Sequence, residues 1–283
     1  MMQLKGAPVA AAITAACKEK ILKLEEKKIV PTLAIVRIGA RSDDEAYEKG
    51  AEKRFAGAGA AVRKYVLPEN AGQAELETLI RNLNTDSAVH GILLFRPLPA
   101  HLEESRIKQL ICMEKDVDGM TYAGLGGLLA ARSGRTASYA PCTPQAVIEL
   151  LEFYGIDVTG KKVTVVGRSP VVGLPLAVML IHKNATVTVC HTKTQDLWKE
   201  CREADIIVAA AGKAHMIGRE HTAGGQVLID VGINFIDGKM CGDIDYDRTS
   251  AQAAAITPVP GGVGAVTTSV LLKHTVDSAE KLC

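Results

Sequence analysis

The sequence predicts an α/β fold made of two α/β domains, the second with a parallel sheet of the Rossmann type. Strand-like and helix-like segments alternate along the chain, as they do in parallel sheets with crossover helices. Aromatic residues make up only 4% of the 283 residues, while the small and branched apolar residues that pack between helices and a buried sheet are abundant. A stretch rich in glycine, alanine and serine, 118–139, separates two such halves.

The first half begins with residues 7–28, where apolar side chains recur at helical spacing and predict an amphipathic helix. Residues 32–39 follow as a run of β-favouring side chains that stops at a glycine. The remaining patterns predict a helix at 43–58, a strand at 61–67, a helix at 71–83 and a strand at 91–95.

The second half follows the stretch 118–139, which we interpret as a loop. Thr143 and Pro144 then favour a helix at 143–154, because a capping hydroxyl followed by proline is typical of a helix start. We expect strands at 162–166, 186–190, 206–210 and 227–231, and a last helix at 267–282 that returns to the first domain. The predicted domains are therefore 1–140 together with 267–283, and 141–266.

Composition argues against several classes of function. The 33 Lys and Arg residues balance 32 Asp and Glu residues without forming a basic stripe, so nucleic acid is not an expected partner. No run approaches the ~18 apolar residues of a membrane span, and the N-terminus lacks a long apolar stretch, so we expect a cytoplasmic protein. The seven cysteines are scattered without a Cys-x-x-Cys pair, which favours reduced thiols, and no metal ion is expected.

A candidate dinucleotide-binding turn follows the first strand of the second domain. Gly167 ends that strand, and Arg168, Ser169, Val172 and Gly173 lead into a helix whose free N–H groups and dipole favour phosphate. The pattern departs from Gly-x-Gly-x-x-Gly, because serine stands at the second glycine and the last glycine comes one residue late. By itself it fits an ordinary strand–turn–helix equally well.

The end of the next strand bears on the choice of nucleotide. NAD-specific sites usually place Asp or Glu there to bind the ribose hydroxyls. This chain instead has a polar and basic segment, Cys190-His191-Thr192-Lys193-Thr194. Thr192 and its neighbours, together with Arg168 in the turn, suit the 2′-phosphate of NADP. They favour NADP over NAD, with an ordinary solvated strand end as the alternative.

Several motifs, in order, resemble the methylenetetrahydrofolate dehydrogenase/cyclohydrolase family. In the second half they are Gly167-Arg168-Ser169 with Val172-Gly173 and Pro175, Asp230-Val231-Gly232-Ile233-Asn234, and Thr257-Pro258-Val259-Pro260-Gly261-Gly262-Val263-Gly264. In the first half they are Pro97-Leu98-Pro99, Lys115-Asp116-Val117-Asp118-Gly119 and Pro141-Cys142-Thr143-Pro144. The resemblance covers essentially the whole chain, and its Pro-Gly-Gly-Val-Gly and Asp-Val-Asp-Gly motifs are highly specific.

The resemblance implies an enzyme of one-carbon metabolism that oxidises 5,10-methylenetetrahydrofolate with NAD(P)⁺. It implies folate against the first domain, the nicotinamide on the second, a cleft between them, and a homodimer. Ile233 belongs to the cofactor site by the same resemblance, and Pro260, Gly261 and Gly262 match the loop at the cleft, where absent side chains allow close backbone approach.

Two residues of the first domain match the family's folate site. Asp118 matches the aspartate that hydrogen-bonds the pterin, whose aminopyrimidine edge offers parallel N–H donors to a carboxylate. Tyr47, eight residues after Gly39, matches the active-site tyrosine that lies along the folate. Without the resemblance, the aspartate would equally be a turn cap and the tyrosine a helix-surface residue.

The chain departs from the bifunctional members at a catalytic pair. Ala51 stands where they carry a lysine one helical turn after the tyrosine, and Phe95 stands at the glutamine that hydrogen-bonds this lysine. Asp44 replaces a common serine. The nearby Lys49 and Lys53 fall on other faces of the predicted helix and are poor substitutes.

Two reactions depend differently on that pair. Hydride transfer from the methylene carbon needs mainly alignment, whereas hydrolysis of the methenyl product needs acid/base groups. We therefore expect a dehydrogenase with lost or weak cyclohydrolase activity. Alternatives are a fully bifunctional enzyme that makes 10-formyltetrahydrofolate, with Arg96 rescuing the chemistry as one route, and a non-catalytic folate- or nucleotide-binding relative. A hydroxy- or amino-acid dehydrogenase is a further alternative, although its candidate bases, His101, His215 and His221, lie in no catalytic motif.

Overall fold

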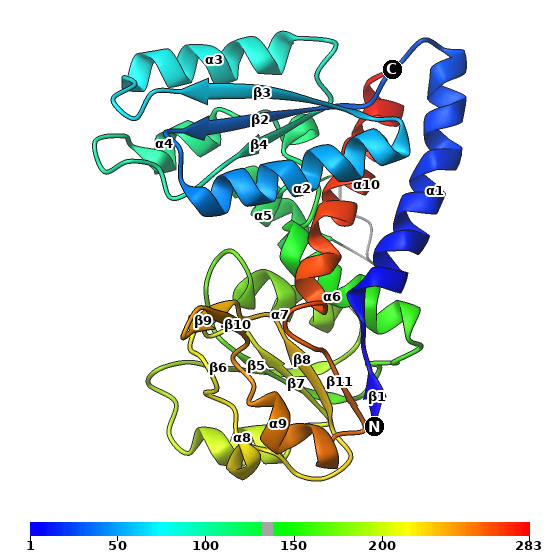
Figure 1. Cartoon of the computed structure of the whole chain (residues 1–283), viewed down its shortest axis with the longest axis vertical. Helices are drawn as coiled ribbons and strands as arrows, with labels where there is room; N and C mark the ends of the chain where they lie inside the picture. Colours follow the sequence, from blue (N-terminus) through cyan, green and yellow to red (C-terminus); the bar gives the residue numbers. More distant parts are fainter. Residues whose placement is uncertain (132–137) are drawn as a thin grey trace. The chain divides into compact units, whose positions relative to one another are not determined.

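The computed structural model describes residues 1–131 and 138–283, which divide into two compact units. One consists mainly of Ala11–Gly127 and Thr268–Cys283, with a short segment ending at Cys142. The other consists mainly of Met1–Ala10 and Thr143–Thr267, with a short segment beginning at Leu128. We call them the three-strand unit and the six-strand unit, after their parallel sheets (Figure 1).

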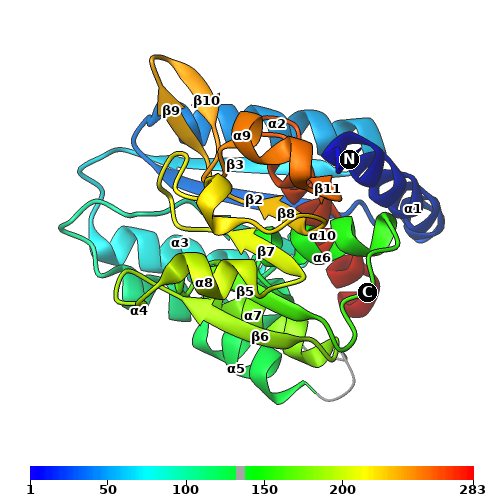
Figure 2. The ribbon, with the colours of Figure 1, turned by 90° about the horizontal axis from the view of Figure 1, so that it is seen from below.

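The sheet of the three-strand unit has the order β3-β2-β4. Its strands are β2 (Thr32–Ile38), β3 (Ala61–Leu67) and β4 (Gly91–Leu94), all parallel, and β2 is buried along its whole length. Helices α2 (Ser42–Ala58) and α3 (Gln73–Thr85) lie on opposite faces of the sheet (Figures 1 and 2). The unit also contains most of α1 (Gly6–Glu26), α4 (Glu104–Gln109), η1 (Met113–Lys115), most of α5 (Tyr122–Ala130) and α10 (Thr267–Leu282).

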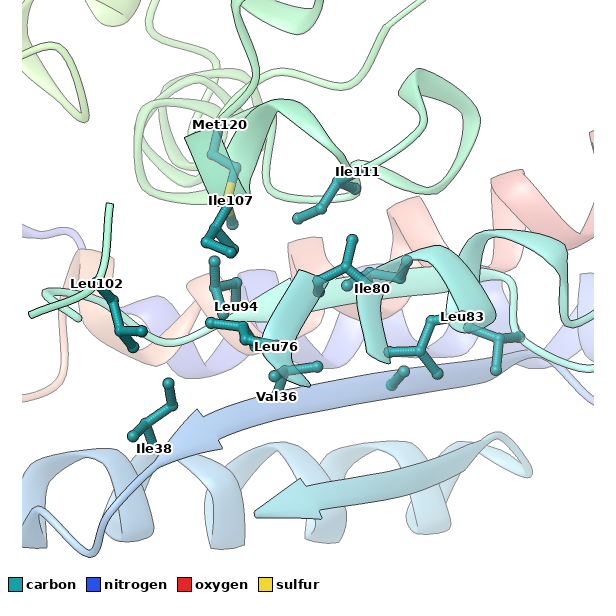
Figure 3. Packing of buried hydrophobic residues seen from close by; sticks show 13 residues of the cluster. Val36, Ile38, Leu76, Ile80, Leu83, Leu94, Leu102, Ile107, Ile111 and Met120 are labelled. Atoms are coloured by element: carbon teal, nitrogen blue, oxygen red, sulfur yellow. The ribbon is translucent and has the colours of Figure 1, made fainter. Parts of the chain in front are cut away.

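One hydrophobic core fills the space between this sheet and α3. Alternate residues of β2, including Val36 and Ile38, face the same way, and Leu76, Ile80 and Leu83 of α3 meet them at helical spacing. Figure 3 shows these side chains gathered with Ile107 of α4 and Ile111. The apolar face that the sequence gives the strand and the apolar face that it gives the helix therefore pack against each other in one core.

The six-strand unit has a parallel sheet with the order β1-β11-β8-β7-β5-β6. Its strands are β5 (Lys162–Val166), β6 (Thr186–Cys190), β7 (Ile206–Ala209), β8 (Val227–Asp230), β11 (Ala255–Ile256) and β1 (Met2–Gln3). Its helices are α6 (Cys142–Phe153), α7 (Gly173–His182), α8 (Leu197–Arg202) and α9 (Tyr246–Thr249), with short 3-10 turns η2 (Arg219–His221), η3 (Ser250–Gln252) and η4 (Val263–Ala265). An antiparallel pair, β9 (Asn234–Ile236) and β10 (Lys239–Cys241), forms a separate hairpin.

The core on one face of this sheet joins the strands to α8. Val166, Ile207 and Leu228 come from three neighbouring strands and pack in one cluster with Cys201 of α8. On the same face, the hydroxyl of Thr164 donates to the carbonyl of Glu200 at 2.9 Å. The predicted fold class is confirmed: both units are α/β, and the second has a parallel Rossmann-type sheet.

The predicted loop at 118–139 is wrong in part, because residues 122–130 form helix α5. The carboxylate of Asp116 accepts the backbone N–H groups of Met120 and Thr121 at 3.0 and 2.9 Å, and these bonds position the start of the helix. The glycines suggested a loop, but tertiary packing outweighs their weak helix propensity. Residues 132–137 of the predicted loop lie outside the described residues.

The helix predicted at 143–154 begins at Cys142, so Thr143 lies inside it and is not its cap. The first N–H of α6 donates instead to Asp118, 24 residues earlier in the chain, at 3.1 Å. The sequence signal for a helix start was therefore correct in place but wrong in its capping residue.

The N-terminus differs from the predicted division of the chain. We assigned 1–140 to the first domain, but Met2 pairs with Ala255 and the N–H of Leu4 donates to Ile256 at 2.8 Å, so the chain starts in the six-strand sheet. A strand of two residues is too short to show a periodicity. All seven cysteines are free thiols. Across residues 1–131 and 138–283, none of the helices has both the length and the apolar character needed to cross a bilayer.

Candidate functional site

The turn after β5 brings backbone segments so close together that it has no room for side chains. Gly167 has φ +134°, and a Cβ there would overlap the carbonyl of Ala210, which follows β7. A Cβ at Gly173 would in turn overlap the carbonyl of Gly167. Both glycines of the predicted turn are therefore required by close backbone approach, which is the geometry of a phosphate-binding turn.

Helix α7 begins directly after this turn. The hydroxyl of Ser169 accepts the N–H of Val172 at 3.1 Å, and the backbone carbonyl of Ser169 accepts the N–H of Leu174 at 3.1 Å. Serine therefore closes the turn at a position where a glycine is usual. Arg168 and Ser169 are exposed. The ten-residue helix thus starts behind an open, basic turn, which fits the pyrophosphate of a dinucleotide.

The other predicted cofactor residues follow neighbouring parallel strands. Thr192 comes after β6 and Ile233 after β8, so they lie at the same carboxyl edge of the sheet as the turn after β5. Thr192 and Ile233 are exposed. The hydroxyl of Thr194 accepts the N–H of His191 at 2.8 Å, which folds the segment after β6 back on itself.

Two buried carboxylates, which we did not predict as site residues, support this edge. Asp243 accepts N–H groups of Ala211, Gly212 and Lys213 at 2.6 to 2.9 Å, and the amide of Asn234 at 2.9 Å. These bonds hold the loop after β7 to the hairpin. A lone Asp in the sequence carries no signal for such a role, because the role depends on tertiary placement.

The second carboxylate is Asp230, at the end of β8. It accepts N–H groups from Gly232, Asp243 and Ile244 at 2.8 to 3.0 Å. Burial raises the pKa of its carboxyl to about 7, the nearby charge of Asp243 acts in the same direction, and the three N–H donors oppose the shift. The motif around Asp230 that carried part of the resemblance is thus largely structural.

The loop Pro260–Gly262 follows β11 in the six-strand unit. The carbonyl of Gly261 accepts the N–H of Gly6 at 2.8 Å, at the first residue of α1. Gly6 in turn has no room for a side chain, since a Cβ there would overlap the carbonyl of Gly262. The close backbone approach expected for this loop is therefore made, at least in part, to the N-terminal segment of the chain.

Tyr47 lies on α2 and contacts Phe95, the residue after β4. Their ring centroids are 5.7 Å apart and the rings are nearly perpendicular. Ala51, one turn further along α2, is fully buried at 0% exposure, whereas Lys49 and Lys53 are exposed. The positions of the expected lysine and glutamine are therefore apolar.

A new ion pair lies at the start of the same helix. Arg41 binds both carboxylate oxygens of Asp44, at 2.8 and 2.9 Å, and donates to the carbonyl of Arg96 at 2.9 Å. Asp44 stands where serine was expected and is buried. The guanidinium of Arg96 is 19% exposed and lies 3.7 Å from Glu104. These charges join the start of α2 to the end of β4.

Lys115, Asp116 and Asp118 of the motif Lys115–Gly119 each bind a different part of the unit. Lys115 is buried and donates to the carbonyls of Leu83 and Asp86 at 3.0 and 2.7 Å, which satisfies the end of α3. Desolvation lowers its pKa. Asp116 binds the start of α5, as described above. Asp118 is half-buried and accepts the N–H of Cys142 at 3.1 Å.

The ionisation of Asp118 reflects opposing effects. Burial raises the pKa of its carboxyl, while the N–H and thiol of Cys142 and the charge of Arg96 lower it. Asp116 adds a smaller upward effect. A carboxylate with these neighbours suits a ligand that offers N–H donors.

The fold and the turn after β5 define a dinucleotide-binding α/β protein, with a separate unit that bears a half-buried aspartate, Asp118, and a tyrosine, Tyr47, packed on Phe95. The chain belongs to the tetrahydrofolate dehydrogenase/cyclohydrolase family. Residues 4–118 match the model of its catalytic domain, and residues 141–283 match the model of its NAD(P)-binding domain.

Individual relatives agree over nearly the whole length. The chain is 47% identical over 283 residues to the bifunctional protein FolD of Carboxydothermus hydrogenoformans, covering 99% of this chain and 98% of that one. The bifunctional FolD structure from Campylobacter jejuni superposes with a TM-score of 0.96 at 40% identity, covering 99% of each chain. The FolD structure from Trypanosoma brucei, complexed with NADP cofactor and inhibitor, has a TM-score of 0.93 at 36% identity, covering 99% of this chain and 98% of that one.

Proposed function

We propose that this protein oxidises 5,10-methylenetetrahydrofolate to 5,10-methenyltetrahydrofolate, with NADP⁺ as hydride acceptor. The observation that carries the proposal is the turn at Gly167–Gly173, which has no room for side chains, in a chain whose two halves match the catalytic and the NAD(P)-binding domain of one family. A hydride with its electron pair leaves the methylene carbon, and the product is the methenyl cation together with NADPH.

The residues of the three-strand unit suit the folate part of this reaction. The lone pair of the folate nitrogen drives hydride loss, so the protein has mainly to align donor and acceptor. Asp118 would accept N–H groups of the pterin, and Tyr47 would lie along the ring system. Neither role requires a general acid or base.

The preference for NADP rests on charge. Arg168 is exposed in the turn, and residues 191–194, directly after β6, include the exposed Thr192 and Lys193 but no carboxylate that could bind a ribose hydroxyl. These cations would attract the 2′-phosphate, which NADP carries and NAD lacks. The Trypanosoma brucei relative complexed with NADP supports the same preference.

The relatives favour a bifunctional enzyme over the expected loss of hydrolysis. Both named FolD proteins from bacteria are described as bifunctional, so the same site in this chain would also convert the methenyl product to 10-formyltetrahydrofolate. In that case the acid/base group is not at the usual position, and Arg96, the residue after Phe95, is a candidate.

A second candidate is a dehydrogenase with weak hydrolysis. The observation that favours it is the apolar character of the two positions near Tyr47: Ala51 is fully buried, and Phe95 packs its ring against the tyrosine. Neither side chain can activate water or deliver a proton.

One preparation tests both candidates. We would measure oxidation of methylenetetrahydrofolate with NADP⁺ and with NAD⁺, and hydrolysis of methenyltetrahydrofolate, in parallel. Faster oxidation with NADP⁺ supports the main proposal, and no oxidation with either cofactor overturns it. Comparable oxidation and hydrolysis identifies the bifunctional enzyme, while oxidation without hydrolysis identifies the second candidate.

The Asp118→Asn variant checks the folate role directly. Loss of a charge-assisted hydrogen bond, worth about 1.5–3 kcal/mol, should lower kcat/KM for methylenetetrahydrofolate roughly 10- to 150-fold. KM for NADP⁺ should stay near that of the parent. An unchanged kcat/KM would remove Asp118 from the site.

A further inference from the structure

We propose that Cys142 is a positioning residue for Asp118: its backbone N–H and its thiol, both at the first turn of α6, fix the carboxylate in the orientation that binds folate. This inference rests on the proposed function and adds a residue to its site. Cys142 itself is 3% exposed and is not expected to touch the substrate.

The backbone part of the argument is direct. Cys142 is the first residue of the 12-residue helix α6, and its N–H donates to Oδ1 of Asp118 at 3.1 Å. Gly119, the residue after Asp118, has φ +58°, and a Cβ there would lie only 2.8 Å from the nitrogen of Pro141. The two chain segments are therefore in close backbone contact, which leaves the aspartate little freedom to move away from α6.

The thiol makes a second connection. The Sγ atom of Cys142 lies 3.4 Å from the carbonyl of Val117, the residue before Asp118, and 3.9 Å from Nδ1 of His274. Nδ1 of His274 lies 2.8 Å from the same Val117 carbonyl. A carbonyl only accepts, so this nitrogen carries a hydrogen and cannot accept the thiol proton.

The thiol proton is therefore donated to the Val117 carbonyl, which belongs to the peptide that joins Val117 to Asp118. Burial and the charge of Asp118 raise the pKa of the thiol well above its usual value, so it stays a neutral donor. A neutral donor next to a carboxylate favours the ionised carboxylate. The cysteine therefore helps to keep Asp118 charged as well as oriented.

Among the described residues, Arg96 and Asp116 also act on the carboxylate through their charges. Arg96, after β4, favours its ionisation, whereas Asp116 and burial oppose it. From α10, His274 faces the thiol through the contacts given above. Burial is the largest effect on the pKa of Asp118, and it raises that pKa. The thiol of Cys142 opposes burial, so its loss should raise the pKa of Asp118 further.

The test compares Cys142→Ala, Cys142→Ser and the matched control Cys17→Ala in the full-length protein. Cys17 lies on α1 in the same unit and is likewise 3% exposed. For each variant we would measure kcat and KM for methylenetetrahydrofolate, the pH profile of kcat/KM, tetrahydrofolate affinity without cofactor, and the melting temperature.

The alanine variant at position 142 should raise KM about three- to tenfold with little change in kcat, because it loses one neutral hydrogen bond. The acid limb of its kcat/KM profile should move to higher pH, since the pKa of Asp118 rises. Serine keeps a donor and should restore KM, with its acid limb at or below that of the parent. Cys17→Ala should leave KM and the pH profile unchanged.

A purely structural cysteine gives a different result. In that case Cys142→Ala and Cys17→Ala both lower the melting temperature but keep the KM, the pH profile and the folate affinity of the parent, and the proposal is overturned. If the alanine variant does not fold, the test is made on Cys142→Ser, through its KM for methylenetetrahydrofolate and the acid limb of its kcat/KM profile. An acid limb at higher pH together with a raised KM in that variant contradicts the proposal. Absence of oxidation by the parent would instead refute the proposed function.

Discussion

At the scale of single residues, two apolar side chains lie at positions 51 and 95, where the family resemblance predicts a lysine and a glutamine. Ala51 is buried on α2, the helix that also carries Tyr47. The rings of Phe95 and Tyr47 are in contact, with their centroids 5.7 Å apart. By the family resemblance, a lysine at position 51 would be oriented by the glutamine that Phe95 replaces, so a lysine introduced alone would lack its partner. The two positions should therefore act together and not singly.

The double variant Ala51→Lys, Phe95→Gln should raise methenyltetrahydrofolate hydrolysis by about tenfold or more, the lower range of general acid/base contributions. Each single variant should gain much less. A lysine at position 51 needs the side-chain amide of a glutamine at position 95 to orient it, and that glutamine without the lysine brings no acid/base group. Loss of methenyl absorbance in a cofactor-free assay measures this. If the parent already hydrolyses rapidly and the double variant gains nothing, another group performs the chemistry.

Asp230 gives the protein a predictable pH dependence. Its carboxyl has a pKa of about 7 in the folded chain, against an ordinary value of 3.8. Between these values the folded state holds more proton than the unfolded state, so this group makes the free energy of unfolding fall as pH rises from about 4 to about 7. Asp230→Asn should make that fall shallower.

Urea unfolding at several pH values measures the effect as a difference in slope between parent and variant. Asp157, an exposed residue whose pKa is lowered by hydrogen bonds from Thr159, provides the control. Asp157→Asn should not reduce the fall over the same pH range. Equal slopes for parent and Asp230→Asn would mean that the three N–H donors outweigh burial.

At the scale of elements, the turn between β5 and α7 owes its shape to contact as well as to backbone conformation. Gly167→Ala places a methyl group on the Ala210 carbonyl at a φ that only glycine adopts readily, so the turn must move. We expect KM for NADP⁺ to rise about tenfold or more, since such strain costs about 1–3 kcal/mol. Initial-rate kinetics at saturating folate test this.

Gly160→Ala separates the two causes. Gly160 also has positive φ, +71°, but no atom lies within 4 Å of the added Cβ. It should lose some stability and keep the KM of the parent for NADP⁺. If both variants raise this KM equally, backbone strain alone explains the effect and the contact with Ala210 does not matter.

The elements predicted from sequence were accurate where a clear period is bounded by turn residues. The strands at 61–67, 162–166 and 186–190 and the helix at 267–282 have the predicted ends. Helix α5 was missed because its glycines resemble a loop. Its start depends on the Asp116 carboxylate, a tertiary contact that no local pattern shows.

The site shows the same limit. The nucleotide turn could be predicted because its glycines, strand and helix are adjacent in sequence. The roles of Asp243 and of the Cys142 thiol could not be predicted, because each binds a segment 25 or more residues away in the chain. A motif such as Lys115–Gly119 marks an important place in the sequence, but only the structure shows that Lys115 and Asp116 bind helix ends while Asp118, which we propose as a folate ligand, binds Cys142.

At the scale of the whole molecule, the six-strand unit depends on the first residues of the chain. Leu4 is 0% exposed and its N–H bonds to Ile256, while Met2 in the same segment is 45% exposed. Leu4→Ala should lower the free energy of unfolding by about 2–5 kcal/mol. Met2→Ala should change it by about 0.5 kcal/mol or less.

Equilibrium unfolding in urea, monitored through the single tryptophan, Trp198 of α8 in the six-strand unit, compares the two variants. Similar small losses for both would show that β1 is not needed for the stability of its sheet. The homodimer implied by the family resemblance remains a prediction.

The pairing of β1 with β11 also sets an order of events during synthesis. Gln3 lies beside β11 and donates to the hydroxyl of Tyr246, 243 residues further along the chain. At roughly 5–20 residues per second, the first strand leaves the ribosome roughly 10–50 s before its partner. During that interval Leu4 has no sheet to cover it, so the nascent chain offers an apolar segment to chaperones until the last strand emerges.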